Sequence, residues 1–250
     1  MLLANPETLI ACAIAVILVG MAKGGFSGLG ALATPIVALV LPPTVAAAIL
    51  LPILIVQDAV SVWAFRHSWD KWIVAWMLPG AVIGVGMGWA MAASIDEKSM
   101  MAVLGAITLV FGVYRLWVER GDRIVAASTS PGWVGSVFGM ATGFTSQIAH
   151  AGGPPFQMWV TPRKLPHLMY VGTNSILFAA INWIKVPSFV ALGVFTHDVL
   201  VAAALLVPLA IATTLISVRV VRTLKPERFY NIIYVLMVLL GGKLILDAFN

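Results

Sequence analysis

The sequence predicts an all-α polytopic membrane protein, and three observations lead to that fold class. The 250 residues are 61% hydrophobic and only 10% charged, with a mean hydropathy of +1.01, which is too apolar for a soluble protein with a wettable surface. The apolar residues form solid runs rather than the alternating pattern of a β-barrel, which favours helices. Glycines, prolines and an aspartate recur at similar spacing, which divides the chain into two related halves.

Six apolar runs are each close to the roughly 20 residues that a helix needs to cross the hydrocarbon core of a bilayer. They cover 44–65, 72–92, 99–117, 166–184, 199–218 and 229–248. We expect a transmembrane helix in each run. Gly80, Gly84 and Gly88 recur at four-residue spacing in the second run, which predicts close packing against another helix.

The two halves repeat one pattern at a nearly constant offset of 124 to 129 residues. The matches are Gly24-Gly25 with Gly152-Gly153, Pro42 with Pro166, Asp70 with Asp198, Leu78-Pro79 with Val207-Pro208, and Gly112 with Gly241. We therefore predict a first repeat over 1–118, a cytoplasmic linker over 119–131 and a second repeat over 132–250. The two repeats together would form one domain.

Each repeat begins with a glycine-broken segment ahead of its three spans, at 5–41 and at 132–164. A continuous helix over 5–41 would be roughly 55 Å long, against a hydrocarbon core of roughly 30 Å, so the segment must break. It could cross once with a kink, cross twice as two short helices, or enter and return as a re-entrant hairpin.

The distribution of Lys and Arg favours a segment that returns to its starting side. If both segments return, eleven basic residues fall on one face of the membrane and three, Lys98, Lys185 and Lys243, fall on the other. If both cross once, the division is seven against seven. Because cytoplasmic loops collect basic residues, the uneven division is preferred, with both termini outside the cytoplasm. The second repeat is then inverted relative to the first, which is a transporter architecture.

The second arm of each hairpin would begin at the tip, where its helix N-terminus attracts anions. The candidate substrate-binding residues lie at or near the two tips. They are Lys23, Gly24, Gly25, Phe26, Ser27, Gly28, Gln147, His150, Gly152, Gly153 and Asn174.

A buried lysine without a partner is costly, so Lys23 calls for either an anionic substrate or a permanent partner. Gln57 and Asp58, in the middle of the first full span, are candidates for that partner, and Asp58 is also a candidate proton carrier. Two alternatives stay open at the other positions. Asn174 equally fits an interhelical hydrogen bond, and His150 equally fits a structural histidine.

Several function classes are disfavoured by the composition. The formal net charge is +5, but the basic residues lie in short loops between spans, so we expect no nucleic-acid partner. A single cysteine, Cys12, excludes an internal disulfide and offers no metal cluster, and no nucleotide or cofactor motif is present. The expected surroundings are the lipid bilayer.

The tip Lys23-Gly24-Gly25-Phe26-Ser27-Gly28, then Leu41-Pro42-Pro43, and then Gly152-Gly153-Pro154-Pro155 resemble the TauE/SafE sulfite-exporter family of bacterial membrane proteins. The resemblance covers nearly the whole chain and rests on the order and duplication of these motifs. It implies export of sulfite or an organosulfonate and places the substrate site at the glycine tips. The protein would then be a secondary transporter in the bacterial cytoplasmic (inner) membrane, without enzymatic activity, working by alternating access around two opposed tips.

Other functions share much of this reasoning. An importer or a channel for the same anions would use the same site and differ only in gating. A membrane-embedded enzyme would use His150 with Asp58, although the four histidines are scattered along the chain. Protons are a candidate coupling ion, and a homodimer is a candidate assembly.

Overall fold

The computed structural model describes residues 2–25, 28–120, 129–220 and 227–249, and within these ranges every regular element is a helix. The elements are η1 (Leu2–Ala4), α1 (Pro6–Lys23), η2 (Leu29–Leu32), α2 (Ala33–Val37), α3 (Pro43–Phe65), α4 (Lys71–Ala92), α5 (Glu97–Arg120), α6 (Gly132–Ala149), α7 (Gly153–Val160), η3 (Thr161–Arg163), α8 (His167–Ala191), α9 (His197–Val220) and α10 (Glu227–Phe249). The all-α prediction is confirmed. The predictions at Phe26 and Ser27, and over most of the linker 119–131, lie outside the described residues.

Six helices of the described residues are long and apolar enough to cross a membrane: α1, α3, α4, α5, α8 and α9. Five of them correspond to predicted spans. α1 is an addition, because it is a continuous helix of 18 residues before the first glycine break. α10 covers the sixth predicted span, 229–248, as a helix, although side chains in its first turns lie outside the described residues.

The predicted span 166–184 is wrong at its C-terminal end. α8 continues for another seven residues, through Lys185 and Pro187 to Ala191. Lys185 is fully buried, so it is not the loop charge at a membrane face that the sequence predicted. The three basic residues assigned to the sparse face therefore become two.

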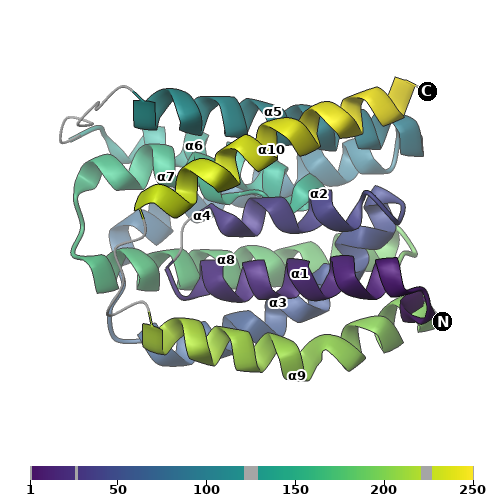
Figure 1. The fold of residues 1–250 in the computed structure, drawn as a ribbon. Coiled ribbons are helices and arrows are strands. Elements are labelled where there is room, and N and C mark those ends of the chain that lie inside the picture. Colours follow the sequence, from purple (N-terminus) through teal and green to yellow (C-terminus); the bar gives the residue numbers. More distant parts are fainter. Residues whose placement is uncertain (1, 26–27, 121–128, 221–226, 250) are drawn as a thin grey trace.

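The chain breaks at both predicted tips. Between α1 and η2, Gly25 and Gly28 have φ values of 110° and 96°, in the left-handed region that glycine adopts without a steric penalty. The arm formed by η2 and α2 then packs beside α1 (Figure 1). Between α6 and α7, His150 takes the left-handed conformation with φ 51°, and α7 packs against α6.

The helices of the two halves pair in a matching way. α1 packs on α9 and α4 on α6; α3 packs on α9 and α4 on α8; α3 also contacts α8, and α5 contacts α10 (Figure 1). The equivalent helices of the two halves are α1 and α6, α3 and α8, α4 and α9, and α5 and α10. When each helix is replaced by its equivalent, every contacting pair becomes a pair that is also in contact.

Glycines let two of these pairs approach closely. A Cβ at Gly80 or Gly84 of α4 would lie 1.9 or 2.0 Å from a backbone oxygen of α6, so only glycine fits there. The predicted close packing of this glycine stripe is confirmed. The α1–α9 pair uses the same device, since a Cβ at Gly20 would lie 2.3 Å from Thr213 Oγ1.

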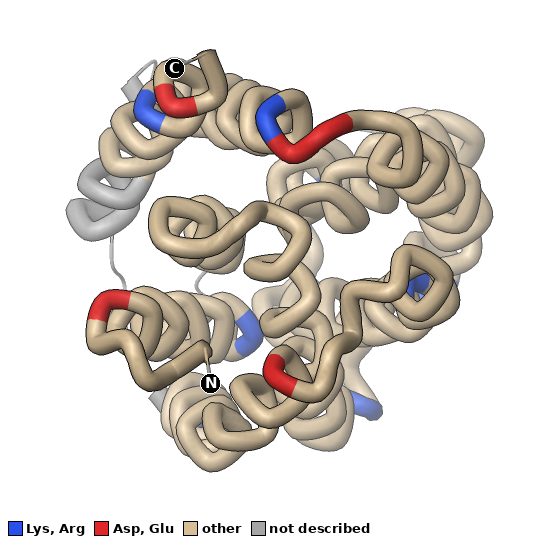
Figure 2. Tube along the Cα trace, turned by 90° about the vertical axis from the view of Figure 1, so that its right-hand side faces the viewer, with Lys and Arg blue, Asp and Glu red and all other residues tan. Residues whose placement is uncertain are grey.

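Both chain termini lie at one end of the helix bundle, which we call the terminal end (Figure 1). Figure 2 views the molecule from this end. The charged residues at the helix ends here are Glu7, Asp96, Glu97, Lys98, Asp198, Lys243 and Asp247. At the opposite end, which we call the basic end, the charged residues whose side chains the structure describes are Arg66, Lys71, Arg115, Arg163, Lys164 and Arg219 with Asp70. Acids therefore collect at the terminal end and bases at the other.

Candidate functional site

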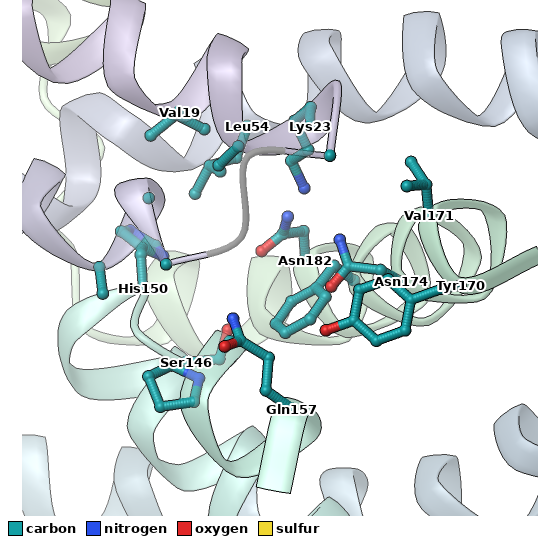
Figure 3. Close-up of a pocket in the computed structure, with 18 residues that line it drawn as sticks. Val19, Lys23, Leu54, Ser146, His150, Gln157, Tyr170, Val171, Asn174 and Asn182 are labelled. Carbon is teal, nitrogen blue, oxygen red and sulfur yellow. The ribbon is translucent and has the colours of Figure 1, made fainter. Parts of the chain in front are cut away.

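A cavity of about 70 Å³, which we call the central cavity, lies between the two tips, α3 and α8 (Figure 3). One water needs about 10–15 Å³ on this measure, so the central cavity has room for an anion of a few heavy atoms. Along α8 it reaches from Tyr170, in the first turn, to Asn182, about 18 Å further on. Tyr170 and Asn174, which lie nearer the basic end of α8, are half-buried, whereas Asn182 is buried. The central cavity is therefore more open toward the basic end.

Six of the predicted binding residues line the central cavity. They are Lys23, Gly25, Gly28, His150, Gly153 and Asn174. Two predicted glycines have a packing role instead. A Cβ at Gly24 would lie 1.9 Å from Ser217 Oγ of α9, and a Cβ at Gly152 would lie 2.7 Å from the Phe178 ring.

The two predicted glutamines also lie away from the central cavity. Gln147 donates from Nε2 to Ser188 Oγ at 2.9 Å and lines a separate cavity at the terminal end. Gln57 donates from Nε2 to the Val16 carbonyl at 3.1 Å, so it is not the partner of Lys23.

Lys23 is paired with Asp58. Its Nζ donates to Asp58 Oδ1 in a buried ion pair, and Asn182 Nδ2 donates to Asp58 Oδ2 at 2.6 Å. The side chains of Lys23 and Asp58 are 7% and 2% exposed. Both carboxylate oxygens are therefore occupied, and this ion pair holds the end of α1 to α3 and α8.

A second buried cluster surrounds Lys185. Its Nζ donates to the Ser146 carbonyl and to Ser146 Oγ, each at 3.1 Å, and lies 2.6 Å from His150 Nδ1. His150 Nε2 lies 2.9 Å from the Ala47 carbonyl oxygen. Because a carbonyl oxygen can only accept, Nε2 carries the proton and Nδ1 accepts from Lys185. The three N–H groups of the Lys185 ammonium thus face three acceptors, none of them a carboxylate.

The buried ionisable side chains at this site include more bases than acids. Among the described residues, the buried Lys, Arg, Asp and Glu side chains are Lys23, Asp58 and Lys185. Asp58 neutralises one lysine. Lys185 has no carboxylate partner, so its protonated form would place one positive charge beside the central cavity. Water screens such a charge poorly in a protein interior, so an anion entering the cavity would be attracted strongly.

The helix N-terminus at the second tip contributes less than the sequence analysis expected. α7 begins at Gly153, which lines the cavity, but the next two residues are Pro154 and Pro155. Proline has no backbone N–H, so the first turn of α7 offers few free donors. The second tip therefore adds little positive potential to the site.

Comparison with protein-family models gives one match, to the family described as sulfite exporter TauE/SafE, over residues 12–244. The chain belongs to the TauE/SafE family. Membership implies a multi-pass membrane protein that exports sulfite or a related anion, and a transporter rather than an enzyme. No curated protein and no solved structure matches the chain.

In this TauE/SafE chain, sequence reasoning missed Lys185, Asn182 and Gln157. Asn182 and Gln157 line the central cavity, and Lys185 lies behind His150. A usable signal was present, because Asn182, Lys185 and Ser188 are spaced by three residues and so share one face of a helix. Among the described residues, no group of three His, Cys, Asp or Glu side chains could hold a metal ion.

Proposed function

We propose that this chain is a secondary transporter that exports a small anion, sulfite or an organosulfonate, by alternating access. Family membership supports the class of transporter. The observation that carries the proposal for this chain is the central cavity, beside which the described residues place two buried lysines and one buried carboxylate.

The neutral groups of the central cavity suit an anion with several oxygens. Asn174, Gln157 and Ser146 bring amide or hydroxyl donors to its wall. Figure 3 shows Lys23 from α1 and Gln157 from α7 pointing into the cavity from different sides. Val19 and Leu54 add apolar wall, which would accommodate the organic group of a sulfonate.

An inverted-repeat architecture fits these contacts. The matched pairing of the helices is what two repeats related by a two-fold axis would produce. Asp58 and Asn182 are 124 residues apart, the same offset as Pro42 and Pro166, and they hydrogen-bond to each other. Equivalent residues that meet lie on the two-fold axis. In this proposal 1–118 and 132–250 are the repeats, and 5–41 and 132–164 are re-entrant hairpins.

The charge distribution supports one orientation. Since cytoplasmic loops are enriched in Lys and Arg, the basic end would face the cytoplasm and both termini the periplasm. The central cavity, which reaches toward the basic end, would then load from the cytoplasm. With an inside-negative potential, moving one negative charge outward is favourable by about 2.3 kcal/mol per 100 mV. Asp58 is the candidate for proton coupling.

Flux of sulfite through purified protein in sealed vesicles tests the proposal. We expect saturable sulfite movement, inhibited by organosulfonates, and counterflow when sulfite is present on both sides. Saturable movement without counterflow would favour a channel, and turnover without movement across the bilayer would favour an enzyme. Folded protein that moves neither sulfite nor a sulfonate would contradict the proposal.

A further inference from the structure

A second cavity, of about 20 Å³, lies at the terminal end of the bundle. Thr44, Ala47 and Gln147 line it, together with Ala92 at the end of α4 and Leu192 just after α8. The central cavity and this second cavity lie on either side of the second tip, because Ser146 faces the first and Gln147 faces the other.

One hydrogen bond joins a wall residue of the central cavity to a wall residue of the second cavity. His150 lines the central cavity, Ala47 lines the second cavity, and His150 Nε2 donates to the Ala47 carbonyl oxygen at 2.9 Å. We call this bond the His150 latch. The imidazole also stacks on Phe189, another residue of the second cavity, with ring centroids 6.0 Å apart. The latch and this stacking together close the second tip against α3 and α8.

The repeat offsets identify the residues of the first tip that are equivalent to the two residues of the His150 latch. The tip offset of 128 relates His150 to Ala22, and the span offset of 124 relates Ala47 to Val171. Ala22 and Val171 both line the central cavity, and an alanine side chain cannot donate a hydrogen bond. The second tip is therefore latched to the opposite repeat, whereas the corresponding place at the first tip borders open space.

We propose that the His150 latch is the gate that closes the terminal end of the transport path, and that Lys185 is its positioning residue. This inference rests on the proposed transport function. Lys185 donates to Nδ1 and thereby keeps the proton on Nε2, where it reaches Ala47. An anion in the central cavity is a stronger acceptor for Nε2–H than a carbonyl oxygen, so its binding draws His150 away from Ala47 and opens the gate.

Two substitutions of His150 form a matched test of the gate. The glutamine amide nitrogen can reach the position of Nε2 and keep the bond to Ala47. The asparagine amide is shorter and lies near Nδ1, where it cannot reach Ala47. Asparagine tolerates the left-handed conformation of residue 150 better than glutamine does, so poorer folding would affect His150→Gln more.

The readout is modification of Thr44→Cys in a Cys12→Ala background, with the protein uniformly oriented in vesicles and no substrate present. A membrane-impermeant thiol reagent is supplied only on the side of the basic end, so that it must pass the gate to reach residue 44. We expect His150→Asn and Lys185→Met to raise the labelling rate about tenfold and His150→Gln to change it less than about twofold, as loss of one buried hydrogen bond implies. Gly86→Ala, where a Cβ would meet nothing within 4 Å, should leave the rate unchanged. Sulfite should speed labelling of the parent protein.

Equal labelling rates in His150→Asn, His150→Gln and the parent protein would overturn the gate, whatever the flux measurements show. Faster labelling of His150→Asn in a protein that moves no sulfite would support the gate as a barrier while contradicting the proposed transport. If His150→Asn cannot be purified, Lys185→Met against His150→Gln gives the same comparison, and equal rates in that pair would overturn the gate.

Discussion

The two buried lysines among the described residues have different electrostatic surroundings. Lys23, at the first tip, meets a carboxylate, whereas Lys185, behind the second tip, meets only a carbonyl, a hydroxyl and an imidazole. The first lysine is neutralised and holds α1 to α3. The second has no carboxylate partner. A lysine in a membrane helix therefore indicates an anion site only when the acids around it are counted as well.

Removing Asp58 should have the largest effect. Asp58→Asn leaves two buried lysines with no carboxylate among the described buried residues, and breaking a buried ion pair costs about 3–5 kcal/mol. The double variant Lys23→Met/Asp58→Asn removes both charges of the pair and should recover most of that loss. Thermal unfolding in detergent measures both. A single variant as stable as the parent protein would show that Asp58 does not compensate Lys23.

The next prediction separates the two lysines by anion affinity. Lys185→Met removes the charge that a protonated Lys185 would place behind His150. It should weaken sulfite binding about 10- to 100-fold, as expected for losing about 1.4–2.8 kcal/mol of Coulomb attraction at an effective dielectric constant of about 20. Lys23→Met/Asp58→Asn keeps that charge and should change the affinity less than about fivefold. Titration of purified protein gives both dissociation constants. The opposite order would make Lys23, and not Lys185, the source of the attraction.

A substitution at a helix contact away from the site tests whether sulfite affinity depends on the site or on helix packing in general. Gly84→Ala brings a Cβ within 2.0 Å of the Met140 carbonyl oxygen, and overpacking of this kind costs about 1–3 kcal/mol. Gly86→Ala, where nothing lies within 4 Å, should be neutral or slightly stabilising. Unfolding midpoints compare the two. Sulfite affinity of the folded fraction should be unchanged in both, and a large loss in Gly84→Ala would mean that affinity follows packing.

The smallest effect is expected at a third lysine. Lys243 on α10 is 56% exposed and pairs with Asp247 one turn later at 2.6 Å. Such an exposed pair contributes at most about 0.5 kcal/mol, so Lys243→Met should leave both stability and sulfite affinity close to those of the parent protein. A loss of affinity comparable to that of Lys185→Met would show that net charge, and not its position, governs binding.

Hydropathy was sufficient to predict the helices that cross the molecule with uninterrupted apolar runs. The predicted spans 44–65, 72–92 and 199–218 lie within two residues of α3, α4 and α9. Hydropathy did not predict the C-terminal end of α8, because a lysine in an apolar run is expected to mark the end of that run. The acceptors that allow Lys185 to be buried come from α6 and the second tip, 35 to 39 residues away, and no local pattern encodes them.

The sequence predicted only part of the site. Lys23 and Asp58 could be paired from the sequence because both are charges within apolar runs, which leaves few partners to choose from. The role of Asn182 could not, because a neutral amide in a helix has many partners within reach. The attraction expected from helix N-termini was overestimated at the second tip, where two prolines remove the backbone donors.

The most direct test of the central claim is to locate a bound anion. Selenite is a heavier analogue of sulfite, and its selenium gives an anomalous diffraction signal that marks one position in a crystal of the protein. The account predicts a peak in the central cavity, within hydrogen-bond distance of His150 or Asn174, that is lost in Lys185→Met. A peak only outside this cavity, or one that persists in Lys185→Met, would contradict it.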